Sequence, residues 1–124
     1  MDFFKHSFME LAGWRDIEKY LSDGISPVCA TGLSHIHKAQ LLYTLSGKTG
    51  FLVVTDSEAE AKRLCDNINT MAQSSRLAML YPAREIFLTS AEGMSRDYEH
   101  QRIEAISAVL SGECRVCLLY TSDA

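Results

Sequence analysis

The chain has 124 residues, of which 47% are hydrophobic and 23% are charged, and its formal net charge at pH 7 is −4. This length fits one domain, and the composition is that of an ordinary globular protein. The acidic balance and the lack of a long Lys/Arg run argue against a nucleic-acid-binding patch, and no apolar run is long enough to span a membrane.

Residues 1–25 are predicted to form a helical N-terminal segment that is interrupted once, at Gly13. Apolar residues from Trp14 to Leu21 follow helical spacing, and Gly24 lies in a stop signal. The polar face carries both signs of charge, whereas a membrane-surface helix has a basic face. We therefore expect an amphipathic helix that lies against the domain after it.

Residues 28–39 have the order of a phosphate-binding loop, in which a strand leads into a glycine turn and then a helix N-terminus. The spacing predicts a strand over 28–31 and a helix that begins after the N-cap Ser34 and ends near Ser46. The template G-x-x-x-x-G-K-[ST] falls on Gly32, His37, Lys38 and Ala39.

Two of these four positions lack the required chemistry. The second glycine is His37, whose side chain opposes a close approach of backbone N–H groups to a phosphate. The metal-binding hydroxyl is replaced by Ala39, which has no oxygen to offer. These residues predict a degenerate phosphate loop, with no bound cofactor, no metal and no catalytic residue. A chance match in an ordinary strand-turn-helix is the alternative.

A second GKT tripeptide, at residues 47–49, lies after a helix and before a strand, which is the reverse of the phosphate-binding order. We interpret Gly47 as the residue that ends the helix. The apolar run Phe51–Thr55 then predicts a strand that is covered on both faces of a parallel sheet. A Ser57-x-x-Glu60 capping box predicts the start of the next helix.

That helix has an apolar face with unbroken 3.6-residue spacing. Its members are Ala61, Leu64, Cys65, Ile68, Met71 and Ala72. A strand over 77–81 ends at Pro82, and a helix over 95–111 has Ile103, Ile106, Val109 and Leu110 as its apolar stripe. The last strand begins at Arg115-Val116. Alternating strands and helices predict a doubly wound α/β fold with a parallel sheet.

Other constellations give weaker signals. His35 and His37 point away from each other on a helix, and Cys114-x-x-Cys117 has no second pair, so neither predicts a metal site. With Cys29 and Cys65, these cysteines are typical of free, mostly buried thiols in a cytoplasmic protein. The N-terminus has no secretory signal pattern. Arg96, Arg102, Glu92 and Glu99 predict a surface ion-pair network, with a binding face as the alternative.

The order of these segments resembles the N-terminal region of the bacterial transcription-repair coupling factors, the Mfd family, over roughly residues 8–116. The matching residues are Ala30-Thr31-Gly32-Leu33-Ser34, Phe51–Thr55, Ala59, Ala61, Leu64, Leu80–Glu85, Ser95-Arg96, Gln101-Arg102-Ile103 and Leu110. That region is similar to the DNA-damage helicase UvrB, with a decayed nucleotide loop. The resemblance implies a RecA-like, P-loop NTPase-like three-layer fold with a mostly parallel sheet.

The resemblance also implies a function for the full-length family. Such proteins are ATP-dependent translocases on double-stranded DNA that displace stalled RNA polymerase and recruit UvrA for nucleotide excision repair. Their ATP and Mg²⁺ belong to motor domains beyond this region. We therefore expect a non-catalytic scaffold that makes mainly intramolecular contacts with the rest of the UvrB-like module.

Residues 117–124 depart from the family and resemble the translation of a transposon-end sequencing adaptor. The expected organisation is an N-terminal helical segment at 1–25, a partial UvrB-like α/β domain at 26–116 and a non-native tail at 117–124. Two other interpretations stay open. One is a small P-loop-like NTPase or helicase N-terminal domain with a variant loop, and the other is a flavodoxin-like domain with a ligand near Gly32 and Asp56.

Overall fold

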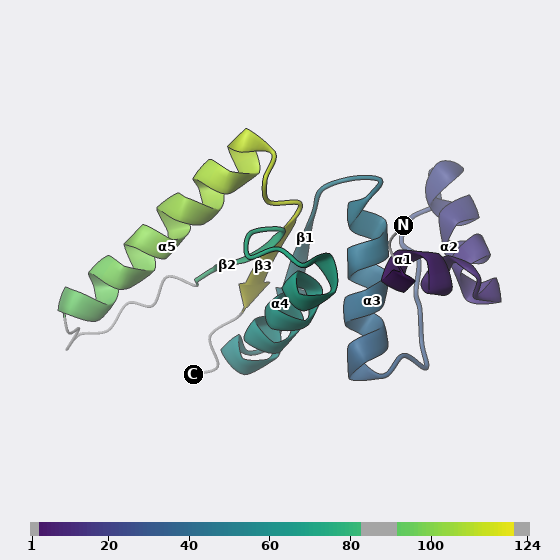
Figure 1. The fold of residues 1–124 in the computed structure, drawn as a ribbon, viewed down its shortest axis with the longest axis horizontal. Coiled ribbons are helices and arrows are strands. Elements are labelled where there is room, and N and C mark those ends of the chain that lie inside the picture. The colour runs from purple at the N-terminus through teal and green to yellow at the C-terminus, as the bar shows by residue number, and fades with distance from the viewer. Residues whose placement is uncertain (1–2, 83–91, 121–124) are drawn as a thin grey trace.

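The structure is a computed structural model that describes residues 3–82 and 92–120, and these form an α/β fold (Figure 1). The helices are α1 (Phe3–Met9), α2 (Ala12–Ser22), α3 (His35–Ser46), α4 (Glu58–Ala72) and α5 (Glu92–Ser111). The strands are β1 (Phe51–Thr55), β2 (Ala78–Tyr81) and β3 (Val116–Tyr120). No helix in the described ranges is long and apolar enough to cross a membrane.

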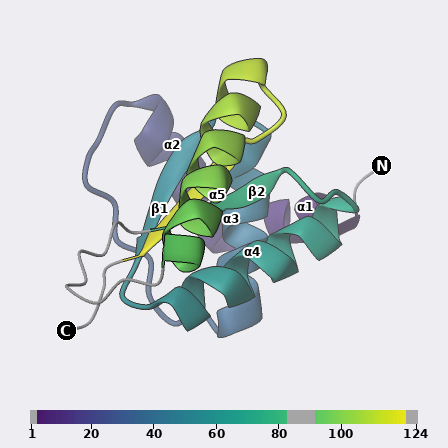
Figure 2. The ribbon, with the colours of Figure 1, turned by 90° about the vertical axis from the view of Figure 1, so that its left-hand side faces the viewer.

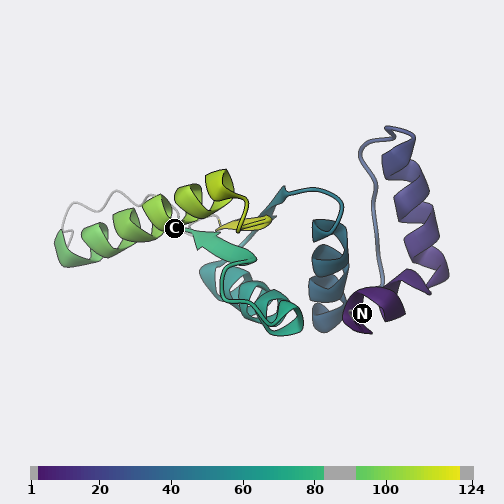
Figure 3. The ribbon, with the colours of Figure 1, turned by 45° about the horizontal axis from the view of Figure 1, so that its top comes forward.

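The strands form a parallel sheet in the order β1-β3-β2. Val116 of β3 lies beside Phe51 on one side and Ala78 on the other, which sets the register of both pairs. Helices flank the sheet, with α4 on one face and α5 on the other (Figures 2 and 3). This arrangement confirms the predicted α/β class and parallel sheet. Three parallel strands do not assign the fold to the P-loop NTPase-like or RecA-like class.

The core lies between α4 and the face of the sheet that α4 covers. Ile68 and Leu64 of α4 are buried against Val116 and Leu118 of β3. Ser57 caps α4, since its Oγ accepts a hydrogen bond from the Glu60 N–H at 3.2 Å. The apolar face predicted from 3.6-residue spacing is therefore the face that packs.

The prediction that β1 is covered on both faces is wrong for the described residues. Leu52 and Val54 are each 68% exposed, whereas Phe51 and Val53 point into the core. Successive side chains of a strand point to opposite faces, and α5 packs on β2 at the other edge of the sheet. We call the side of the sheet on which Leu52, Val54 and α5 lie the α5 face. At β1, no described helix covers this face.

The predicted apolar stripe of α5 does not face the sheet either. Leu110 is 82% and Ile103 is 65% exposed, whereas Ala105 and Ala108 are buried. Since α5 contacts β2, the side of the helix that carries these two alanines is the side that packs on the sheet. The stripe Ile103, Ile106, Val109 and Leu110 consequently faces outward.

The N-terminal helices extend the layer formed by α3 and α4. The Gln40 side chain of α3 donates a hydrogen bond to the Phe4 carbonyl at 2.9 Å, and the rings of Phe8 and Trp14 meet edge to face at 5.9 Å. The predicted interruption at Gly13 is misplaced, because the helices separate at residues 10–11. Leu21 of the expected apolar face is exposed.

The predicted strand at 28–31 is absent. Residues 25–33 run along the side of α3 that faces away from α4 (Figures 1 and 3), where no other strand lies. Without a neighbouring strand the backbone cannot form a ladder, and Cys29 to Thr31 are exposed. A short apolar run before a helix is thus insufficient to place a strand in the sheet.

Residues 117–120 lie within the central strand β3, and Cys117 and Leu118 are buried. They therefore belong to the core of the described fold. The predicted origin of 117–124 in an adaptor stays a prediction, and residues 121–124 lie outside the described residues.

Candidate functional site

The segment predicted to be a degenerate phosphate loop lies at the N-terminus of α3. Gly32 has a φ of +78°, a left-handed conformation that a side chain disfavours. Ser34 is the N-cap, and its Oγ accepts a hydrogen bond from the His37 N–H at 3.3 Å. This cap satisfies a donor that a phosphate would otherwise contact.

The positions that the phosphate-loop template aligned point in different directions. Lys38 and His37 are exposed, whereas Ala39 is fully buried in the core beside Tyr43 and Leu64. The position where the template requires a metal-binding hydroxyl therefore lies inside the packing of α3 on α4. A hydroxyl there would face apolar side chains rather than a metal ion in a phosphate pocket.

A contact that the sequence did not predict joins the N-termini of α3 and α4. His35 Nδ1 lies 3.4 Å from Glu60 Oε1, and both side chains are partly buried. His35 Nε2 is buried and has no hydrogen-bond partner in the described part of the chain. The Glu60 side chain thus contacts His35. Of the two hydrogen bonds of the predicted capping box, the described residues form the one from the Glu60 N–H to Ser57 Oγ. Sequence spacing gives no signal for a pair this far apart in the chain.

Three of the four cysteines are buried, and all four are free. Burial raises the pKa of the Cys65 thiol to about 11, and it also raises the pKa of Cys114 and of Cys117. Raised pKa values keep these groups as unreactive thiols. Among the described residues no group of three His, Cys, Asp or Glu side chains could hold a metal ion. Cys29 is the exposed cysteine.

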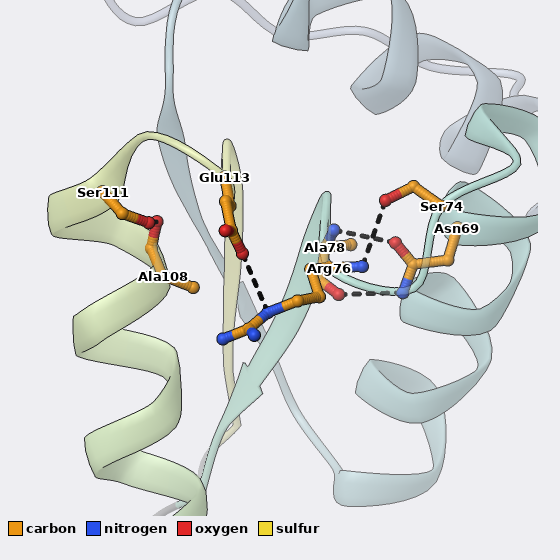
Figure 4. A network of polar contacts seen from close by, with 7 residues as sticks. All are labelled: Asn69, Ser74, Arg76, Ala78, Ala108, Ser111 and Glu113. Carbon is orange, nitrogen blue, oxygen red and sulfur yellow. Dashed lines mark hydrogen bonds and ion pairs between the residues drawn. The ribbon is translucent and has the colours of Figure 1, made fainter.

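A polar network at the other end of α4 connects the helix to the sheet (Figure 4). The Asn69 amide donates to the Ala78 carbonyl at 2.9 Å and accepts from the Ala78 N–H at 2.9 Å. Arg76 then pairs with Glu113 at 3.1 Å, which ties the start of β2 to the turn before β3. These contacts occupy the groups that a ligand would use, so we interpret the network as structural.

An open hollow of about 530 Å³ lies beside this network. The residues that line it have polar side chains and are Asp66, Asn69, Thr70, Gln73, Ser74 and Ser75. Ligand pockets are usually clefts that enclose most of the ligand, whereas this hollow is wide open to solvent, so it does not have the character of a binding site.

Arg102, one member of the predicted surface network, contacts the end of β2. Arg102 Nε donates to the Pro82 carbonyl at 2.8 Å, and its guanidinium lies 5.9 Å from the centre of the Tyr81 ring. Arg102 therefore anchors α5 to the end of β2. The side chains of Glu92 and Arg96 lie outside the described residues, so their part of the prediction stays open.

Comparison of the chain with protein-family models, with curated proteins and with solved structures gave no match.

Proposed function

We propose that this chain is the N-terminal scaffold of a transcription-repair coupling factor and is itself non-catalytic. In the full-length family, motor domains elsewhere bind ATP and Mg²⁺, move along double-stranded DNA and displace stalled RNA polymerase. The UvrB-like module to which this region belongs serves recruitment of UvrA. The proposal rests on the order of motifs in the sequence together with the geometry at the start of α3.

The burial of Ala39 is the observation that carries the non-catalytic part of the proposal. A phosphate loop needs a hydroxyl at this position to hold the metal that bridges the phosphates. Here the position is a methyl group with no exposed surface, packed between α3 and α4. Together with His37 in place of glycine, this favours a scaffold role over nucleotide binding.

The exposed apolar surfaces support the proposed intramolecular role. Leu52 and Val54 on β1, and Ile103 and Leu110 on α5, expose large apolar side chains to solvent. Exposed large apolar side chains that share one face of a strand or helix are typical of surfaces that contact other protein. Under the proposal, the rest of the UvrB-like module covers them.

The test is an independent amplification and sequencing of the gene beyond codon 116. The proposal predicts that the natural frame departs from residues 117–124 and encodes helicase motifs several hundred residues downstream. A gene that retains residues 117–124 and continues into an unrelated domain would contradict it.

The alternative is a small P-loop-like NTPase or a helicase N-terminal domain with a variant phosphate loop. Two observations favour it: Gly32 keeps the left-handed backbone of a loop glycine, and Lys38 is exposed and has no ion-pair partner among the described residues. Nucleotide binding that depends on Lys38 would distinguish this alternative from the scaffold.

A further inference from the structure

We draw no further inference here: the strongest candidate, the exposed apolar surface that Leu52 and Val54 of β1 and the outward-facing stripe of α5 present, carries no proposal because nothing in the structure shows what covers it.

Discussion

Leu64 lies at the centre of the buried face of α4 and is only 4% exposed. It packs in the same cluster as Ile68, Tyr43 and Val116, so shortening it removes apolar contacts from three elements. We predict that Leu64→Ala lowers the free energy of unfolding by roughly 2–5 kcal/mol, the usual effect of a core truncation that leaves a cavity. Urea denaturation followed by circular dichroism measures this change.

The matched control for that substitution is Leu110→Ala, because Leu110 is the same residue type but is 82% exposed. It is expected to change stability by less than about 0.5 kcal/mol. A loss below about 1 kcal/mol for Leu64→Ala would show that this face of α4 is not the core.

The buried thiol of Cys65 predicts a dependence of stability on pH. Its pKa is raised from 9.0 to about 11, mainly by burial and then by the charge of Asp66. Between pH 9 and pH 11 the Cys65 thiol is protonated in the folded state but ionised in the unfolded state, which favours unfolding. The contribution of Cys65 to the free energy of unfolding is therefore complete below pH 9 and falls as the pH rises toward 11. Urea denaturation at pH 8 and at pH 11 measures it.

Cys65→Ala serves as the comparison, because it removes the titrating group and keeps an apolar residue. The difference in stability between wild type and Cys65→Ala should shrink between pH 8 and pH 11. A difference that stays constant over this range would mean that the thiol titrates alike in both states.

At the scale of elements, α5 packs through small residues. Ala105 and Ala108 are buried against the sheet, and the larger apolar side chains face outward. We predict that Ala108→Leu destabilises the fold by about 1–3 kcal/mol, because the extra atoms force the helix away from the strands. Thermal unfolding of Ala108→Leu beside Ile106→Ala tests this. If the two substitutions have equal effects, the orientation of α5 is wrong.

The elements that sequence reasoning placed well have strong local signals. The α4 helix has a serine cap and uninterrupted apolar spacing, and the strands β1, β2 and β3 are short apolar runs between clear turns. Gly47 correctly predicted that α3 ends at Ser46, because glycine commonly follows the last residue of a helix. These features depend on residues close together in the chain, which is why a single sequence reveals them.

The sequence did not predict which side of α5 is buried, the course of residues 28–31 or the contact of His35 with Glu60, because each depends on neighbouring elements in space. The stripe on α5 is apolar, but two alanines on another side of the helix decide which side approaches the sheet. The run at 28–31 resembles a strand, but no strand pairs with it in this structure. Likewise, the contact of His35 with Glu60 joins two helices, and no spacing rule connects these residues.

At the scale of the whole molecule, we propose that this α/β fold retains the order of a phosphate loop without its chemistry. Ser34 caps α3 where a phosphate would approach, and Ala39 is buried where a hydroxyl would bind Mg²⁺. Under the proposed function, the fold is a scaffold whose exposed apolar side chains contact other parts of a larger protein. An intact nucleotide site would make that account untenable.

Isothermal titration calorimetry with Mg-ATP, on the wild-type chain and on Lys38→Ala, tests this claim most directly. The account predicts no saturable binding heat for either protein, because neither the backbone cradle nor the metal ligand is present at the start of α3. Saturable binding by the wild-type chain that is lost in Lys38→Ala would contradict it and would identify a working nucleotide site.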